Sequence, residues 1–426
     1  MSANTPICFV GMTHLGLVSA IASATKGSKV VCFDQSATLI EELIAGKFPV
    51  SEPGLNTAAA EHSTQISFTS DLESIKQCDI VYLSVDVPTD DAGNSNLDPI
   101  LEHFKLIKNH INDKAIVVIL CQVPPGFTRS LNFDNLRLFY QVETLVFGRA
   151  LERATQPERF IVGSSDSNQP LPAFFQNFLA HFRCPILHMS YESAELTKIA
   201  INLFLVSSIS TTNMLSDICE RIGADWAEIV PALRLDARIG PNAYLKPGLG
   251  FGGGNLERDV TTIRHIGEQT GANTNLAELW TANSNGRRML VSQIVKDLFS
   301  NDWKEKHFCI LGLAYKENTA STKNSASLKL LRELQGAKLT VHDPIVIIDE
   351  NNYQVTQYST ALEAATGADV VAIMTPWPQY QDLDSGVLKN VMSGTILIDP
   401  FAVLKSDNVA ESSLKYFTLG RALGLE

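Results

Sequence analysis

Short apolar runs, rich in β-branched residues, alternate with longer segments of helical periodicity in the first third of the chain. The runs occupy residues 6–10, 29–33, 79–85 and 115–120. Such nearly continuous apolar runs are typical of strands that are buried on both faces of a sheet. The alternation with helical segments predicts βαβ units, and therefore a parallel sheet covered by helices.

A different pattern occupies the middle of the chain. Residues 193–223 are mainly apolar and almost free of helix-breaking residues, which predicts one long helix, or two, linking two halves. A glycine-rich segment at 246–255 predicts irregular backbone that closely approaches another group. Helical patterns then resume to about residue 302.

The strand-and-turn pattern returns in the last third of the chain, at residues 307–316, 338–344, 369–374 and 395–400. We therefore predict an α/β protein with two similar α/β halves, linked by one long helix or by two. The predicted boundaries are 1–192 for a nucleotide-binding domain, 193–302 for a helical linking region and 303–426 for a second α/β domain.

Composition and charge exclude several classes of function. The chain has 426 residues and a formal net charge of −12, which gives no electrostatic support for nucleic-acid binding. Its 7 cysteines are scattered without CxxC spacing, and its 9 histidines form no HxxxH pair, so we expect neither a disulfide scaffold nor a bound metal. No apolar run matches a membrane span and no signal peptide is evident, so we expect a cytoplasmic protein.

The turn after the first predicted strand reads GMTHLG over residues 11–16. It matches a GxGxxG dinucleotide-binding turn at Gly11 and Gly16, whereas Thr13 takes the place of the middle glycine. The second predicted strand ends at Asp34, whose carboxylate can accept hydrogen bonds from a ribose and would repel a 2′-phosphate. The turn alone leaves a working site and a decayed site open. The strand–turn–helix context and Asp34 favour a working site for NAD.

Several stretches resemble the nucleotide-sugar dehydrogenases, such as the UDP-glucose 6-dehydrogenases. They are, in chain order, FPVSEPGL (48–55), VDVPTDDAGNSNLD (85–98), AELTKIAIN (194–202), DARIGPNAYLKPGLGFGGGNLERD (236–259) and GLAYKENTASTKNS (312–325). The resemblance implies an α/β fold of two Rossmann-like, doubly wound domains joined by a long central helix, and a homodimer formed through that helix. The second of these domains would bind the nucleotide sugar. It also implies oxidation of a sugar C6 alcohol to an acid in two NAD-dependent steps, through a thiohemiacetal and a thioester on a cysteine. Enzymes of this kind supply sugar acids for polysaccharide biosynthesis.

The predicted hydride-transfer residues are present. Lys198 and Asn202 are four residues apart and so share a helix face, where an ammonium and an amide can stabilise an alkoxide. The resemblance gives the matching pair this role. It also identifies Glu143 and Asp259 as the carboxylates that position or activate water.

The residues of the thioester step have changed. Asn255 occupies the position of the nucleophilic cysteine, and an amide is not a useful nucleophile. Gln122 replaces the threonine that helps to order water in the family. The adjacent Cys121 ends a predicted strand and would point to the opposite face, so we interpret it as a buried, inert cysteine rather than a relocated nucleophile.

The resemblance also assigns binding residues. The cofactor set includes Asp86, which stands where the family has glycine, and Lys323, which stands where it has arginine; in full it is Gly11, Thr13, Gly16, Asp34, Asp86, Pro88, Thr89 and Lys323. Arg238 matches an arginine that reaches the substrate of the neighbouring subunit. The substrate set is Arg238, Tyr244, Leu245, Gly248, Gly250, Phe251, Gly252, Gly253 and Lys316.

Three functions follow from this pattern. The first is an NAD-dependent dehydrogenase that oxidises the C6 alcohol of a UDP-sugar without a thioester, with Asp259 or Glu143 acting as base towards water. The second is a two-electron oxidation that stops at an aldehyde or ketone, or that returns the hydride after epimerisation or elimination. The third is a protein that binds a nucleotide sugar and does no chemistry.

Overall fold

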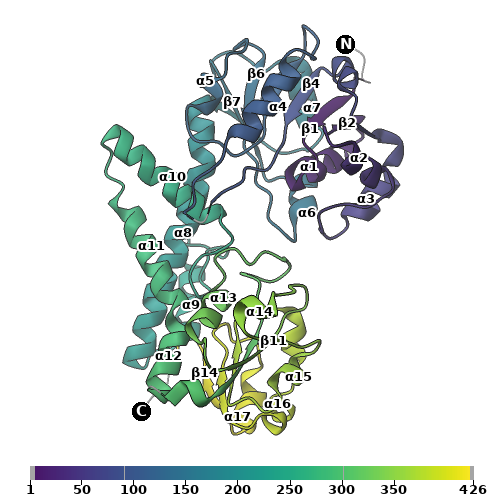
Figure 1. Cartoon of the computed structure of the whole chain (residues 1–426). Coiled ribbons are helices and arrows are strands. Elements are labelled where there is room, and N and C mark those ends of the chain that lie inside the picture. Colours follow the sequence, from purple (N-terminus) through teal and green to yellow (C-terminus); the bar gives the residue numbers. More distant parts are fainter. Residues whose placement is uncertain (1–4, 91, 301, 423–426) are drawn as a thin grey trace. The chain divides into compact units, whose positions relative to one another are not determined.

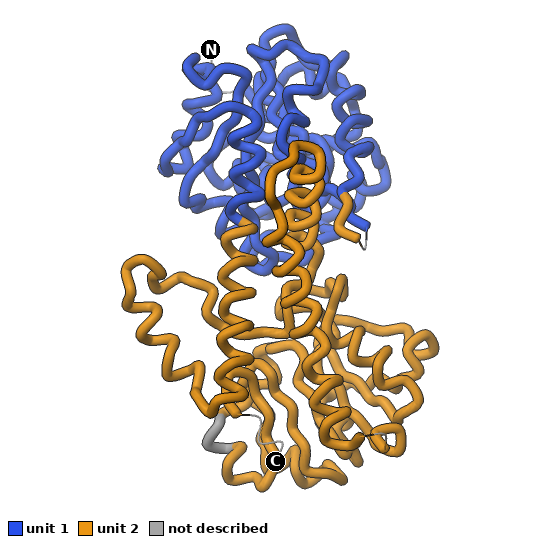
Figure 2. Tube along the Cα trace, turned by 90° about the vertical axis from the view of Figure 1, so that its left-hand side faces the viewer, with its two compact units in different colours: residues 1–90, 95–201 blue, residues 91–94, 202–426 orange. Residues whose placement is uncertain are grey.

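The structure, a computed structural model, describes residues 5–90, 92–300 and 302–422. It divides into two compact units (Figure 2). Unit 1 consists of residues 1–90 and 95–201, and unit 2 consists of residues 91–94 and 202–426. The division into three regions that we predicted is a finer one, and it stays a prediction.

Unit 1 contains an eight-stranded sheet in the order β3-β2-β1-β4-β5-β6-β7-β8 (Figure 1). The strands are β1 Ile7–Val10, β2 Val30–Phe33, β3 Ile66–Thr69, β4 Ile80–Leu83, β5 Ile116–Ile119, β6 Leu138–Gln141, β7 Phe160–Ser164 and β8 Ile186–Ser190. The helices are α1 His14–Thr25, α2 Ala37–Ile44, α3 Leu55–Glu61, α4 Asp98–Lys108, α5 Phe127–Ser130, α6 Ala150–Thr155 and α7 Ala173–Ala180.

The predicted parallel sheet is confirmed with one exception, because β6 and β7 are antiparallel. A parallel neighbour needs a crossover connection that returns the chain to the other end of the sheet. The chain between β6 and β7 carries only the short helix α6, and it re-enters the sheet from the end at which it left. The predicted burial of the strands on both faces of the sheet is confirmed for β1. There Ile7 and Phe9 pack into one buried cluster, and Cys8 and Val10 pack into another.

Helix α8 spans Tyr191–Ile222 as a single helix of 32 residues, so the first of our two alternatives is correct. The boundary between the units falls within it, after Ile201. By length and composition α8 could also cross a membrane, which differs from the expectation that no apolar run matches a membrane span. It nevertheless carries the buried polar residues Glu195, Lys198 and Asn202, which are bonded within the protein. We therefore interpret α8 as a helix of the folded protein that buries some of its side chains and exposes others, rather than as a membrane span.

Unit 2 continues with four helices, α9 Trp226–Leu235, α10 Asn255–Thr270, α11 Asn275–Arg288 and α12 Leu290–Phe299. A six-stranded parallel sheet follows in the order β11-β10-β9-β12-β13-β14. Its strands are β9 His307–Leu311, β10 Lys338–His342, β11 Thr356–Gln357, β12 Val370–Ile373, β13 Ile396–Ile398 and β14 Lys415–Phe417. Its helices are α13 Ala326–Glu333, α14 Glu350–Tyr353, α15 Ala361–Ala365, α16 Ser385–Val391 and α17 Ser406–Glu411.

In each sheet, the strand that comes first in the chain lies in the interior of the sheet. In unit 1, β1 lies between β2 and β4, and in unit 2, β9 lies between β10 and β12. The strand order therefore reverses direction beside the first strand of each sheet, as expected for doubly wound folds. Ligands of such folds bind at the carboxyl ends of the strands at this reversal.

Candidate active site

The turn between β1 and α1 requires glycine at two positions. Gly11 has a φ of +93°, and a Cβ on it would lie 2.2 Å from Cγ1 of Val85. A Cβ on Gly16 would lie 1.9 Å from the carbonyl oxygen of Gly11. The two glycines therefore allow α1 to start directly above the sheet, at the reversal of strand order, as a dinucleotide-binding turn requires.

Thr13 occupies the middle glycine position without strain. Its φ of −81° and ψ of −171° are ordinary extended values. Its hydroxyl oxygen accepts a hydrogen bond of 3.0 Å from the backbone N–H of Asp86. The carboxylate of Asp86 in turn accepts a hydrogen bond of 3.1 Å from the N–H of His14, the first residue of α1. Thr13 therefore connects the start of α1 to the loop after β4.

Asp34 lies at the end of β2, as predicted, and is held beside the same turn. One carboxylate oxygen accepts a hydrogen bond of 2.8 Å from the N–H of Met12, and the other accepts one of 2.9 Å from the N–H of Ser36. The side chain remains partly exposed. The close-packed glycines and this oriented carboxylate fit the adenosine half of NAD. Of the other predicted cofactor residues, the carbonyl of Pro88 accepts from Asn96 and Thr89 forms a strand bridge with Ser95.

A hydrogen bond between two side chains next to this turn was not predicted from the sequence. His14 Nε2 lies 2.8 Å from the buried carboxylate of Glu52, which also accepts hydrogen bonds from the N–H groups of Gly148 and Ala150. Glu52 belongs to the SEPG stretch that we used only as evidence of resemblance. A buried carboxylate with this many donors ties α1 to the loop that follows β6.

Lys198 and Glu143 come together in unit 1. The ammonium lies 3.6 Å from the carboxylate, and both side chains are mostly buried. Glu143 also accepts a hydrogen bond from the N–H of Leu145. Glu195, one helical turn before Lys198, is fully buried and accepts from the N–H groups of Gly126 and Thr128. Burial raises the pKa of Glu195 above its usual value.

Cys121 is buried, as predicted, and its thiol lies 3.2 Å from the carbonyl oxygen of Leu83. Burial raises the pKa of this thiol far above its ordinary range. A thiol that stays protonated and inaccessible cannot act as a nucleophile. Gln122, its neighbour, is partly exposed.

Asn202 and Asp259 come together in unit 2. The amide nitrogen of Asn202 donates a hydrogen bond of 2.5 Å to the carboxylate of Asp259. The guanidinium of the neighbouring Arg258 lies 3.6 Å from the same carboxylate, and all three side chains are buried. Asn202 follows Lys198 by one turn of α8, so both predicted polar residues of this helix have a carboxylate partner.

The glycine-rich loop is held by α11 and by residues before α13. A Cβ on Gly250 would lie 2.5 Å from the carbonyl oxygen of Ser284, and one on Gly253 would lie 2.3 Å from the ring of Tyr315. Phe251 donates its N–H to the hydroxyl of Ser284 and accepts at its carbonyl from Arg288. The roles of Ser284 and Arg288 were not predicted, because polar residues within a helical pattern are usually exposed to solvent.

Asn255 is the first residue of α10 and its side chain is exposed. The preceding Gly254 has a φ of +89°, and a Cβ on it would meet the side chain of Lys323 at 3.0 Å. The aliphatic chain of Lys323 therefore lies against the glycine-rich loop. Its assignment to the cofactor residues stays a prediction.

The remaining predicted substrate residues surround the same loop or lie on the surface. Tyr244 is half-exposed, whereas Leu245 is buried and accepts from the indole of Trp226. The N–H of Gly248 donates to the amide oxygen of Asn213.

The other three predicted substrate residues are Gly252, Lys316 and Arg238. A Cβ on Gly252 would lie 3.2 Å from the carbonyl of Asn324, and the ammonium of Lys316 lies 5.8 Å from the ring of Tyr315. Arg238 is exposed and pairs with Asp236 at 2.7 Å.

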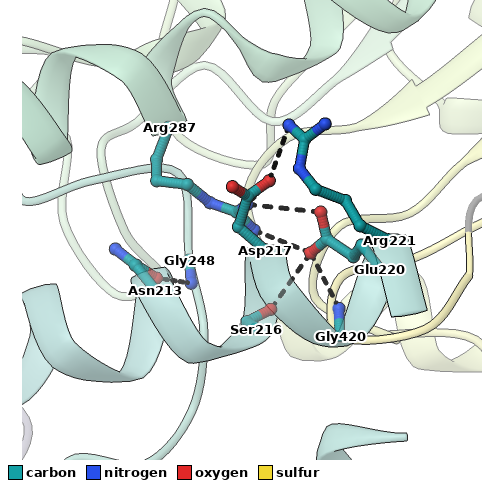
Figure 3. Close-up of polar contacts among 8 residues, drawn as sticks. All are labelled: Asn213, Ser216, Asp217, Glu220, Arg221, Gly248, Arg287 and Gly420. Carbon is teal, nitrogen blue, oxygen red and sulfur yellow. Dashed lines mark hydrogen bonds and ion pairs between the residues drawn. The ribbon is translucent and has the colours of Figure 1, made fainter. Parts of the chain in front are cut away.

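A buried ion pair supports this region of unit 2 (Figure 3). Arg287 on α11 donates to both carboxylate oxygens of Glu220 on α8, at 2.9 and 3.3 Å. Glu220 also accepts from the hydroxyl of Ser216 and from the N–H of Gly420. The network therefore fastens α11, which holds the glycine-rich loop, and the segment around Gly420 to α8.

Comparison with known proteins gives matches in three parts of the chain. Three models of the UDP-glucose/GDP-mannose dehydrogenase family match it in order: the NAD-binding domain at residues 5–179, the central domain at 192–285 and the UDP-binding domain at 309–406. The UDP-glucose 6-dehydrogenase TuaD of Bacillus subtilis (strain 168) is 29% identical, covering 97% of this chain and 93% of that protein. A UDP-glucose 6-dehydrogenase of Rickettsia bellii (strain RML369-C) is 28% identical, covering 97% and 99%.

A UDP-glucose dehydrogenase structure from the archaeon Pyrobaculum islandicum superimposes with a TM-score of 0.85 at 26% sequence identity, covering 99% of this chain and 98% of that one.

Proposed function

Because the chain belongs to the UDP-glucose/GDP-mannose dehydrogenase family, we propose that it oxidises the C6 alcohol of a UDP-sugar with NAD, without a covalent thioester. The observation that carries this proposal is the pair of buried polar residues on α8. Lys198 has Glu143 as its partner and Asn202 has Asp259. Burial of a polar group costs free energy unless it is bonded, so these carboxylate partners hold the ammonium and the amide in place on α8.

NAD would be held by the Gly11–Gly16 turn and by Asp34, and it supplies the acceptor for a hydride. The alcohol loses that hydride from carbon to NAD and its hydroxyl proton to solvent water, which leaves an aldehyde. The ammonium of Lys198 and the amide of Asn202 stabilise the alkoxide that develops as the proton leaves. Glu143 or Asp259 accepts a proton from water if the hydrated aldehyde is oxidised again.

A second candidate is an oxidation that stops after two electrons. It is favoured by Asn255, whose exposed amide stands at the start of α10 where a thiol would attack the aldehyde. No cysteine occurs between Cys219 and Cys309, and both of these are buried. Without a thiohemiacetal, the second hydride transfer depends on hydration of the aldehyde alone.

Product analysis tests both candidates. Wild-type protein incubated with NAD and a panel of UDP- and GDP-sugars is followed by NADH absorbance and mass spectrometry. We expect NADH and an aldehyde or acid from a UDP-sugar; two NADH per acid would support the four-electron reaction, and one NADH per aldehyde the two-electron reaction. Absence of NADH and product across the panel would contradict both and leave nucleotide-sugar binding as the function.

The variant Asn255→Cys sharpens this test. A thiol at the first position of α10 lies at a helix amino terminus, which lowers the pKa of a cysteine and increases its thiolate fraction. The acid-to-aldehyde ratio should therefore increase several-fold over that of wild type, while Asn255→Ser should leave the ratio unchanged. An unchanged ratio in the cysteine variant would mean that the surrounding groups no longer support thioester chemistry.

We also propose that the chain forms a homodimer through α8. Phe204, Met214, Ile218 and Ile222 expose apolar side chains on this helix, at 80%, 50%, 42% and 71% of their surface. The last three recur every four residues and so form one stripe. A stripe of this kind on a soluble protein marks an interaction surface. The exposed Arg238 is consistent with a residue that serves a partner's substrate.

The variant Ile222→Glu tests the dimer. Glutamate at this position would bury a charge in the paired apolar surface, which should raise the dissociation constant of the dimer by about 100-fold, the effect of losing a hot-spot residue. The matched control is Ile44→Glu on α2, because Ile44 is similarly exposed at 66% but lies outside the stripe. Sedimentation velocity would show a monomer only for Ile222→Glu; a wild-type monomer, or dimers for both variants, would contradict the proposal.

A further inference from the structure

The amino terminus of α1 already carries an anion from the protein itself. The carboxylate of Asp86 lies 3.1 Å from the N–H of His14, the first residue of α1. The backbone N–H groups of a first helical turn have no partners within the helix, and together with the helix dipole they attract negative groups. In a dinucleotide-binding fold the cofactor's diphosphate occupies this position.

Asp86 is held in this place by the loop after β4. Its own N–H donates a hydrogen bond of 3.0 Å to the hydroxyl of Thr13, the residue that precedes α1. The hydroxyl of Thr13 also lies 3.4 Å from the carbonyl oxygen of Ser84. Asp86 therefore donates one hydrogen bond to Thr13 and accepts another from His14 across the mouth of the turn, and its side chain stays exposed to solvent.

Two consequences follow for a ligand that carries a diphosphate. One backbone donor of α1 is already engaged, so a phosphate oxygen must displace the carboxylate to use it. The charge of Asp86 also repels a diphosphate at short range, since like charges a few ångströms apart disfavour each other even near the surface. The adenosine half of the ligand meets neither obstacle, because Asp34 at the end of β2 is oriented independently by Met12 and Ser36.

We infer that Asp86 competes with the diphosphate of NAD for the start of α1 and sets the cofactor affinity of this chain. The inference rests on the proposed function, because it takes the Gly11–Gly16 turn as the NAD site. Thr13 is a positioning residue in this arrangement, since it orients the loop that presents Asp86. Binding of NAD therefore requires the Asp86 carboxylate to swing away from His14.

Calorimetric titration of the purified full chain with three probes tests this inference. Adenosine, ADP and NAD are titrated into wild type, Asp86→Asn and Asp86→Ala, with magnesium absent and then present. We expect ADP and NAD to bind both variants about ten-fold more tightly than wild type, and adenosine to bind all three proteins equally. Asp113→Asn is the matched control, because Asp113 is an exposed aspartate of unit 1 and its replacement changes the net charge equally.

The outcomes separate the inference from the proposed function. Equal NAD affinities for wild type and both Asp86 variants would overturn the inference alone. Weaker NAD binding by the variants, including weakening only with magnesium present, would also overturn it, because Asp86 would then help to hold the diphosphate. If wild type and the variants bind none of the three probes, the Gly11–Gly16 turn is not an NAD site, and the proposed function is contradicted as well. A thermal melt of each variant confirms that the titrated protein is folded.

Discussion

Replacing Lys198 with alanine should lower the rate of NADH formation from a UDP-sugar by about 100- to 1,000-fold, the usual effect of removing one donor to a developing oxyanion. Lys198 is buried on α8 and its nearest charged partner is Glu143, at 3.6 Å. Without the ammonium, the alkoxide loses its charge partner and Glu143 adds an unopposed negative charge. Titration with UDP should give the same affinity as wild type, because we expect UDP to bind to unit 2.

The control for this variant is Lys76→Ala. Lys76 also pairs with a glutamate in unit 1, but its side chain is 50% exposed, so its removal should leave the rate unchanged. A rate for Lys198→Ala within two-fold of wild type, with UDP binding intact, would rule out the role that we assign to this lysine. The variant Lys198→Arg distinguishes the effect of the positive charge from the effect of its position, since arginine keeps the charge but places it elsewhere.

Replacing Arg287 with methionine should lower the free energy of unfolding of unit 2 by about 3–5 kcal/mol, as expected when one partner of a buried ion pair is removed. Glu220 would stay buried with only the hydroxyl of Ser216 and the N–H of Gly420 as donors. The control is Arg221→Met: Arg221 pairs with Asp217, but 74% of its side chain is exposed, so the expected loss is at most about 1 kcal/mol.

The tryptophans make this measurement selective. All 4 tryptophans of the chain, Trp226, Trp280, Trp303 and Trp377, belong to unit 2. Their fluorescence during denaturant unfolding therefore reports on unit 2, whether or not unit 1 unfolds separately. Equal midpoints for the two arginine variants would show that the Glu220 network contributes no more than a surface ion pair.

The parts of the fold that could be predicted from the sequence are those in which local pattern and burial agree. The strands β1, β2, β4 and β5 are apolar and buried along their whole length, and each was predicted within one or two residues. The edge strands β3 and β8 are only half-buried, so their apolar signal is weak. The antiparallel pairing of β6 with β7 depends on the path of the connecting chain, which periodicity does not report.

In the candidate site, too, contacts between residues far apart in the chain could not be predicted from local pattern. The spacing of Lys198 and Asn202 predicted a shared helix face, but not that Glu143 and Asp259 would be their partners, because those contacts join residues far apart in the chain. In the sequence, Thr13 is a departure from the glycine turn that leaves a decayed cofactor site open. Its ordinary φ and its bond to Asp86 become visible only when β1 and β4 are side by side. Glu52 and Arg288 act through backbone groups that no sequence motif encodes.

The bond between Glu220 and Gly420 also has a consequence for biosynthesis. The two residues are 200 positions apart in the chain. At a synthesis rate of about 5–20 residues per second, roughly 10–40 s pass between their appearance at the ribosome. During this interval α8 can already pair with Arg287, but the carboxylate of Glu220 still lacks one of its donors. The last turns of α8 therefore reach their final hydrogen bonding only after Gly420 has been synthesised, so this part of unit 2 completes its folding well after α8 has left the ribosome.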